Sequence, residues 1–241
     1  MPLSVIRFNN AGLILPADDP TRQGRTVLEP CTLELAERRI AVIGANGSGK
    51  STLLRMLNGL VSPSTGSVAV HGFDTVRQAK SVRQRVGFLF TDPLSQLVMP
   101  IVSEDVELSL KASHRDRGAR AAAALRALAA LGLDHLAQRS IYDLSGGERQ
   151  LVALCSVLAA GQDILVADEP TTLLDLANNE LLQATLGALD QQVIYATHDL
   201  DFAAAADRAL LVAGGKIAFD GPAPEAVAAY RRLVRQGSPA S

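Results

Sequence analysis

Short aliphatic runs alternate along the chain with segments of helical character, and most runs have a turn signal at one end. Four runs are almost continuously apolar and predict buried strands, at residues 39–43, 84–88, 163–167 and 192–196. Such apolarity is typical of a parallel sheet that is covered on both faces. Residues 118–131, rich in Ala, Leu and Arg, and residues 146–160 predict helices between the second and third of these strands. The pattern therefore predicts an α/β fold.

The composition limits the kinds of partner. The chain has 241 residues, of which 48% are hydrophobic, enough to bury a substantial core. Lys and Arg total 23 against 25 Asp and Glu, so the net charge of -2 offers no excess positive charge for a nucleic-acid backbone. No signal peptide is visible, and no run reaches the ~18 apolar residues of a membrane span. We expect a soluble cytosolic protein with no nucleic-acid partner, in which Cys31 and Cys155 pack as small apolar groups.

A glycine-rich segment follows the first predicted strand and precedes a helical stretch. It reads GANGSGKS over residues 44–51 and matches the phosphate-binding pattern G-x-x-x-x-G-K-[ST]. Its glycines let successive N–H groups face a phosphate, and the following helix directs the positive end of its dipole at the same anion. In this pattern Lys50 reaches the β- and γ-phosphates of a nucleotide, and the Ser51 hydroxyl binds Mg²⁺.

Two carboxylates follow the third predicted strand, in the sequence ILVADEP at residues 164–170. An acid at the carboxyl end of a buried strand lies where ligands bind in open α/β folds. Asp168 is therefore a candidate for the Mg²⁺ shell, and Glu169 for polarising an attacking water. An acid pair after a strand is often only a turn or a helix cap, but the phosphate-binding segment upstream favours the functional interpretation.

The sequence LSGGERQ at residues 144–150 opens the second predicted helix. Ser145 and Glu148 have the spacing of a capping box, which is a structural role. Two glycines at a helix N-terminus also expose N–H groups to an anion. Since one segment already holds the phosphates within its own chain, a second anion-binding helix start suggests a nucleotide shared between two chains.

In this order, GANGSGKST, LSGGERQ, ILVADEP, TTLLD and ATHDL resemble the nucleotide-binding subunit of an ATP-binding-cassette transporter. The resemblance covers about residues 1–221, and LSGGERQ is its most discriminating part. It implies an ATPase with a P-loop (RecA-like) core of mainly parallel sheet, an antiparallel β portion and an inserted α-helical subdomain. The expected division is a core at 1–90 and 155–221, a helical subdomain at 91–154, and a C-terminal helix and tail at 222–241.

The resemblance also implies a head-to-tail dimer that encloses two ATP molecules. Glu169 would be the general base, His198 would sense the γ-phosphate together with Lys50, and Asp175 lies in the segment that links the two sites. Ser51 and Asp168 would hold Mg²⁺. The residues that contact ATP would come from both chains: Gly44, Asn46, Gly47, Ser48, Gly49, Lys50, Ser51 and Thr52 from one, and Ser145, Gly146, Gly147 and Gln150 from the other.

Two positions depart from the family pattern. Relatives usually have a glutamine that touches Mg²⁺ and the attacking water after the strand VGFLF, and here this position is Thr91. A threonine hydroxyl has a shorter reach, so we expect Thr91 to contribute to the metal site through a bridging water. Relatives also stack an aromatic residue on adenine, but none lies between Phe8 and Phe73. Either Phe8 takes that place, or aliphatics such as Leu13 or Leu15 pack less strongly on the base.

The segment TDPLSQLVMPIVSEDV at residues 91–106 resembles the ATPases of energy-coupling-factor uptake systems for vitamins, cobalt and nickel. There it forms the groove for the coupling helix of a membrane subunit. Asp92, Glu104 and Asp105 suit a basic residue on that helix, although a solvated helix start is the alternative.

Within this group the chain is most similar to the ATPase of biotin uptake systems, with a cobalt or nickel system second. The resemblance places it at the cytoplasmic face of the membrane, as a homodimer or as a heterodimer with a related ATPase. Its expected partners are a transmembrane coupling subunit and a substrate-binding membrane subunit. A soluble cassette ATPase that acts on nucleic acid or ribosomes is the remaining alternative.

Overall fold

The strands form two sheets in the computed structural model, which describes residues 6–16, 24–172 and 174–237. The larger sheet contains β3 (Arg39–Ile43), β6 (Val86–Leu89), β7 (Ile164–Asp168), β8 (Gln192–Ala196), β9 (Arg208–Ala213) and β10 (Lys216–Gly221), in the spatial order β10-β9-β3-β8-β7-β6. Its strands pair in parallel except at the β9–β10 edge. The smaller, antiparallel sheet contains β1 (Ile6–Leu15), β2 (Arg25–Leu35), β4 (Thr65–Val70) and β5 (Phe73–Asp74).

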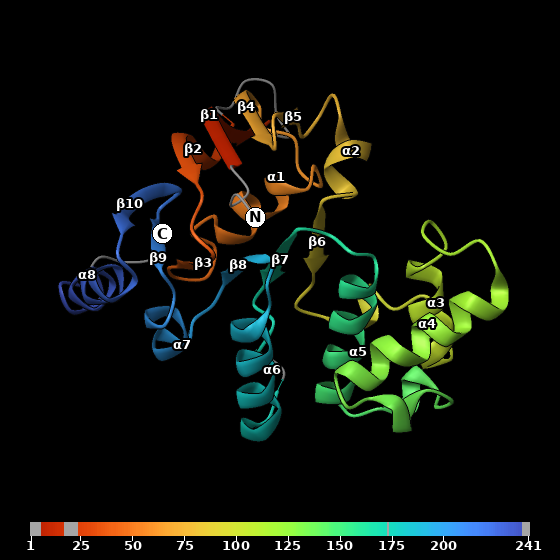
Figure 1. The fold of residues 1–241 in the computed structure, drawn as a ribbon. Coiled ribbons are helices and arrows are strands. Elements are labelled where there is room, and N and C mark those ends of the chain that lie inside the picture. The colour runs from red at the N-terminus through yellow and green to blue at the C-terminus, as the bar shows by residue number, and fades with distance from the viewer. Residues whose placement is uncertain (1–5, 17–23, 173, 238–241) are drawn as a thin grey trace.

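The helices fall into groups that Figure 1 separates clearly. α3 (Val102–Ser109), α4 (Arg117–Ala130) and α5 (Gly146–Ala159) pack together on one side of the molecule, and α8 (Ala223–Arg235) lies at the opposite side. α1 (Lys50–Leu57) lies between the two sheets, and α2 (Ala79–Arg83) precedes β6. The remaining helices are α6 (Leu176–Ala188) and α7 (Leu200–Ala204), with short 3₁₀ turns η1 (Pro93–Ser95), η2 (Asp134–Leu136) and η3 (Ile141–Asp143).

Two hydrophobic cores lie on opposite faces of the larger sheet. Successive strand residues point to opposite faces, and in β3 Ile40 and Val42 enter the core shared with α1 and the smaller sheet. Ala41 and Ile43 enter the other core, which contains residues from α3 to α8. The sheet is thus buried on both sides, which explains the near-continuous apolarity of its central strands.

The predicted elements are present with small shifts at their ends. The strands predicted at 39–43 and 192–196 coincide with β3 and β8, whereas β6 and β7 begin two residues and one residue later than predicted. The two predicted helices are α4 and α5. The α/β fold with an antiparallel portion and a helical insertion is confirmed. The division into domains stays a prediction, and its expected boundary at residue 154 falls inside α5.

The two cysteines lie in apolar surroundings. Burial raises the pKa of the Cys155 thiol to about 12 and that of the half-buried Cys31 thiol to about 11. Both thiols therefore stay protonated at neutral pH, which suits packing rather than reactivity. Among the helices described, none combines the length and the apolar content that a bilayer crossing requires.

Candidate active site

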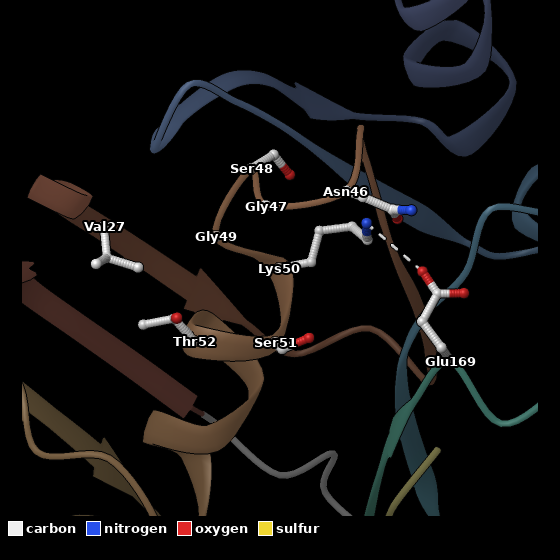
Figure 2. Close-up of a pocket in the computed structure, with 9 residues that line it drawn as sticks. All are labelled: Val27, Asn46, Gly47, Ser48, Gly49, Lys50, Ser51, Thr52 and Glu169. Carbon is white, nitrogen blue, oxygen red and sulfur yellow. Dashed lines mark ion pairs between the residues drawn. The ribbon is translucent and has the colours of Figure 1, made fainter. Parts of the chain in front are cut away.

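The segment between β3 and α1 forms a loop around a pocket. Gly44 and Gly49 have positive φ angles of 145° and 111°. A Cβ atom on Gly44 would lie 2.0 Å from the backbone oxygen of Val212, so both conformation and space require glycine there. Figure 2 shows the loop curled around the pocket, with Lys50 and Glu169 facing each other across it. The pocket is lined by Val27 of β2, Asn46, Gly47, Ser48 and Gly49 of the loop, Lys50, Ser51 and Thr52 of α1, and Glu169.

The ammonium group of Lys50 is buried inside this loop. Its Nζ donates hydrogen bonds to the carbonyl oxygens of Gly44 at 2.9 Å and Ala45 at 3.2 Å. It also lies 3.5 Å from Oε1 of Glu169, as the dashed line in Figure 2 marks. A phosphate that enters the loop therefore meets a fixed positive charge beside the N-terminus of α1, where N–H groups and the helix dipole also favour an anion.

A hydroxyl and a carboxylate lie side by side where β7 meets α1. Ser51 Oγ donates to Oδ1 of Asp168 at 2.8 Å, and Arg55 Nη2 lies 3.3 Å from the other carboxylate oxygen. Such oxygens suit Mg²⁺, which commonly takes one or two protein ligands and completes its shell with water and substrate phosphates. No cluster of three His, Cys, Asp or Glu side chains suited to a metal occurs in the described ranges. Ser51 and Asp168 therefore fit an ion that is bound together with phosphates.

The carboxylate of Glu169 lies between a lysine and a histidine. One oxygen faces Lys50, and Nδ1 of His198 lies 2.8 Å from the other. His198 follows β8, the neighbour of β7, so adjacent strand ends bring the two side chains together. The side chain of His198 is 62% exposed against 15% for Glu169. The site thus has a sheltered carboxylate and an imidazole that is open to solvent.

Thr91 reaches the same strand end from β6. Its Oγ1 donates a hydrogen bond to the backbone carbonyl oxygen of Asp168 at 2.6 Å. Thr91 therefore hydrogen-bonds to the backbone of Asp168 and not to its carboxylate. The carboxylate is hydrogen-bonded to Ser51 and Arg55 instead. Gln96 does not replace the usual glutamine, because its amide bonds to the backbones of Phe90 and Ala153.

The LSGGERQ segment forms the start of α5 with the predicted capping box. Ser145 Oγ accepts a hydrogen bond from the N–H of Glu148 at 3.2 Å, and the Glu148 carboxylate accepts one from the N–H of Ser145 at 2.7 Å. The backbone hydrogen bond is the main cause that lowers the pKa of Glu148. Ser145 and Gly146 are exposed. None of residues 145–150 lines the pocket of their own chain, so this helix start is available to a ligand bound elsewhere.

Two other members of the segment are turned into the chain. Gln150 is 1% exposed, and its Nε2 donates to the carbonyl oxygen of Phe90 at 3.1 Å. This burial argues against the expected contact between Gln150 and a phosphate held by a partner chain. At Gly147, a Cβ atom would lie 2.3 Å from Cγ of Asn178. The Asn178 amide donates to both carboxylate oxygens of Asp175 at 3.0 Å. Gly147 therefore packs against the side chain that holds the Asp175 carboxylate in place.

Comparison with known proteins identifies the family. A family model described as ABC transporter matches residues 28–172. The chain belongs to the ABC transporter family. It is 43% identical over 228 residues to a biotin transport ATP-binding protein of Rhizobium etli, covering 95% of this chain and 98% of the relative. It is 40% identical to a nickel import ATP-binding protein of Rhodobacter capsulatus, covering 82% of this chain and 84% of the relative.

A solved structure extends this similarity to the fold. The chain resembles a dimeric, post-hydrolysis state of an ATP-binding cassette bound to ADP and Pi, with a TM-score of 0.80 and 26% identity. The similarity covers 90% of this chain and 98% of the other. This ABC protein is therefore an ATPase with the P-loop fold that its sequence predicts.

For the adenine contact, the structure argues against Phe8, one of the two alternatives that the sequence leaves open. Phe8 is 1% exposed and packs in the core of the smaller sheet, so its ring is not available to a base. Leu13 is half-buried, Leu15 is 46% exposed, and residues 17–23 lie outside the described ranges. Val27 lines the pocket and was not predicted, because its role depends on β2 passing beside the loop and no motif marks it. An aliphatic contact is thus present in the pocket.

The acids expected to attract a coupling helix are mostly engaged within the chain. Asp105 is buried and accepts hydrogen bonds from the N–H groups of Val98 and Met99 and from the hydroxyl of Ser156. Asp92 caps η1. Like Asp92, Glu104 is exposed, and within the described residues its carboxylate has no comparable hydrogen bonds. The neighbouring pocket between β6, α3 and α5 has a mixed lining, with apolar side chains such as Val86, Phe88 and Val157 beside polar ones that include Asp105 and Gln162.

Proposed function

We propose that this ABC ATPase powers the uptake of biotin through an energy-coupling-factor transporter. The observation that carries the proposal is the 43% identity to a biotin transport ATP-binding protein over nearly the full length of both chains. The segment at 91–106, with its resemblance to energy-coupling-factor ATPases, supports the same class. The substrate would not touch this chain, whose task is to convert ATP hydrolysis into movement of membrane partners.

The proposed assembly is a head-to-tail dimer at the cytoplasmic face of the membrane. The pocket contains only one of the two phosphate-binding segments, and the exposed Ser145 and Gly146 lie outside it. A second copy, or a related ATPase, would supply the missing segment. The solved dimer of a similar cassette supports this arrangement. A transmembrane coupling subunit and a substrate-binding membrane subunit complete the proposed transporter.

The side chains of the pocket suit hydrolysis of the γ-phosphate. Lys50 and the loop N–H groups would bind the phosphates, and Mg²⁺ held by Ser51 and Asp168 would neutralise part of their charge. Glu169 would accept a proton from the attacking water while a new P–O bond forms and the bond to ADP breaks. His198, which is hydrogen-bonded to Glu169 and exposed, would contact the γ-phosphate.

Hydrolysis would change the attraction between the two subunits. The γ-phosphate would lie between Lys50 of one subunit and the N-terminus of α5 of the other, so its charge would contribute to the interface. Its removal would weaken the dimer and let the subunits separate. Closing and opening would move the membrane partners that are bound to them.

A nickel or cobalt importer is the second candidate. The 40% identity to a nickel import ATP-binding protein favours it, although that similarity covers less of the chain. A soluble cassette acting on nucleic acid has less support, since the net charge of -2 gives no general attraction to phosphate backbones.

Uptake by the whole complex tests the proposal. The chain would be expressed with its genomic neighbours in a bacterial strain that lacks biotin and nickel importers, and labelled biotin and nickel would be offered separately. We expect biotin to accumulate, and Glu169→Gln to abolish the accumulation. Nickel uptake without biotin uptake would support the second candidate. Biotin uptake that is unchanged when this chain is omitted from the complex would show that this chain does not power the transport.

A further inference from the structure

The peptide group between Asp168 and Glu169 is held from both sides. Glu169 has φ of 50°, a conformation that is strained for a non-glycine residue and persists only when its surroundings enforce it. On one side, the N–H of Glu169 donates to the carbonyl oxygen of Ala196 at the end of β8, at 3.2 Å. On the other side, the carbonyl oxygen of Asp168 accepts the hydrogen bond from Thr91 at 2.6 Å.

The hydroxyl of Thr91 continues the contact between β6 and β7 beyond its last backbone pair. That pair is Leu89 with Ala167, one residue before Asp168. β6 ends at Leu89, and the side chain of Thr91 then supplies a hydrogen bond to the next residue of β7. Without this hydroxyl, the peptide group between Asp168 and Glu169 would keep, within the described part of the chain, the single hydrogen bond to Ala196 of β8.

Thr91 is itself positioned from α5. The N–H of Phe90, the preceding residue, donates to Oε1 of Gln96 at 3.3 Å, and its carbonyl oxygen accepts from Nε2 of the buried Gln150 at 3.1 Å. Gln96 in turn donates to the carbonyl oxygen of Ala153 at 3.3 Å. Both polar groups of the Phe90 backbone are therefore fixed by amide side chains that belong to α5 or bond to it.

We propose that Thr91 is a positioning residue for Glu169 and not part of the metal site. Its hydroxyl holds the Asp168–Glu169 peptide so that the carboxylate faces Lys50 and His198. Gln150 and Phe90 connect this contact to α5, the helix that begins at the LSGGERQ glycines. The inference rests on the proposed role of Glu169 as general base, and its tests separate the two.

Removal of the hydroxyl tests the role directly. Thr91→Val keeps the shape of the side chain and removes the donor, whereas Thr91→Ser keeps the donor. For Thr91→Val in the full-length chain we expect kcat to fall about 10- to 100-fold, since small misplacements of a catalytic group have effects of this size. The KM for ATP and the Mg²⁺ concentration for half-maximal rate should change less than about twofold, because the hydroxyl bonds to a backbone carbonyl and Thr91 does not line the pocket. Thr91→Ser should restore most of kcat.

Binding of a fluorescent ATP analogue, with and without Mg²⁺, gives a second readout that does not depend on turnover. We expect Thr91→Val to bind the analogue with the same affinity as the unaltered chain. Addition of Mg²⁺ should increase that affinity by the same factor in both. A weaker response to Mg²⁺ would indicate a metal role and overturn the inference. An unchanged kcat, or a failure of Thr91→Ser to restore it, would overturn it as well.

A double-mutant cycle separates Thr91 from the role of Glu169. Single-turnover hydrolysis would be compared in Glu169→Gln and in Glu169→Gln/Thr91→Val. If Thr91 acts through Glu169, the second substitution should lower the rate no further. If Thr91→Val lowers the hydrolysis rate of Glu169→Gln by the same factor as it lowers the rate of the unaltered chain, the Thr91 inference alone is refuted. Near-normal hydrolysis in Glu169→Gln would instead refute the general-base role.

A substitution at Gln150 tests the proposed connection between Thr91 and α5. Gln150→Leu removes the donor to Phe90, and we expect it to lower kcat without weakening binding of the analogue. Combined with Thr91→Val, it should give less than the product of the two separate losses, because both act on one chain of contacts. Independent, fully multiplicative losses would contradict the connection.

Discussion

One carboxylate oxygen of Glu169 faces Lys50 and the other faces His198. Lys50 is also held by two carbonyl oxygens of the loop, so its charge is already placed where the phosphates would arrive. Preorganised charge of this kind needs little rearrangement during reaction and is a common source of catalytic power. At the scale of the residue, the candidate site therefore holds its charged groups in fixed places, which suits the proposed hydrolysis.

Glu169→Gln tests the role of this carboxylate. The amide keeps the size of the side chain but is a poor proton acceptor, so we expect hydrolysis to fall by about 10²- to 10⁴-fold, the usual contribution of a general base. Binding of ATP should persist, because the loop and Lys50 are unchanged. Phosphate release and equilibrium binding measure the two effects. A near-normal rate would remove Glu169 from the role.

The base of the nucleotide should be recognised weakly. Val27 is the apolar side chain that lines the described pocket, and it offers neither donors nor acceptors that would distinguish adenine from guanine. We expect the Kd values for ATP and GTP to agree within about tenfold, equivalent to ~1.4 kcal/mol. Competition binding would measure the two Kd values. A strong preference for ATP would contradict the prediction.

Sequence motifs located nearly all of the charged site, and the reason is physical. Asp168 and Glu169 lie at the end of β7, and Lys50 lies at the start of the helix that follows β3, so the chain direction alone determines which edge of the sheet they reach. The burial of Phe8 and the place of Val27 in the pocket could not be predicted, because both depend on how the smaller sheet packs over α1. The inward direction of Gln150 was also hidden, since it depends on a partner in another segment.

At the scale of the element, the start of α5 is packed against the start of α6. Gly147 contacts Asn178, and Asn178 holds the carboxylate of Asp175, which also caps α6. The two glycines of LSGGERQ therefore have different surroundings, since Gly146 is exposed and Gly147 is buried. The absence of a side chain at Gly147 is a packing requirement within one chain.

Gly147→Ala should disturb this contact. The new Cβ would overlap Asn178, and overpacking of this kind typically costs ~1–3 kcal/mol. We expect a lower midpoint of urea unfolding and a reduced ATPase rate as Asp175 moves. Gly187→Ala, inside α6 with no atom within 4 Å of the new Cβ, is the matched control and should stabilise by roughly 0.5–1 kcal/mol. Equal behaviour of the two variants would contradict the packing role.

Asp105 of α3 stabilises the segment that precedes this helix. Its carboxylate accepts from two partly buried backbone N–H groups and from the buried Ser156 of α5, so Asp105→Ala would remove the partner of all three donors. We expect a loss of about 1–3 kcal/mol in the free energy of unfolding. Glu104→Ala, at the exposed neighbouring position, should cost less than about 1 kcal/mol. Urea titration of both variants measures the difference.

At the scale of the whole molecule, two hydrophobic cores are joined through one sheet, and the site lies at the carboxyl ends of its central strands. The helical group α3–α5 is attached to the edge strand β6, as Figure 1 shows. A second ATPase subunit would face the LSGGERQ end of this group. In the proposed dimer, each molecule would therefore contribute two separate parts of its surface to two shared nucleotide sites.

Association should accordingly depend on ATP. We expect Glu169→Gln to elute as a dimer with ATP and as a monomer with ADP in size-exclusion chromatography. Adding Gly146→Asp, which places a negative charge where the partner's phosphate would approach, should keep the chain monomeric while its own pocket still binds ATP. A dimer that forms in spite of this charge would contradict the proposed interface.

The hydrogen bonds of Phe90 limit how this protein can be recombined with its relatives. Phe90 and Thr91 lie at the junction with the helical group, whereas Gln150 lies in α5 at the far end of that group in the sequence. A chimera that exchanges residues 91–154 for those of a relative with a glutamine after β6 would replace Thr91 and Gln150 together. A crossover placed between Thr91 and Gln150 would combine one residue of this protein with the other residue of the relative. We expect such chimeras to fold and bind nucleotide but to hydrolyse it slowly.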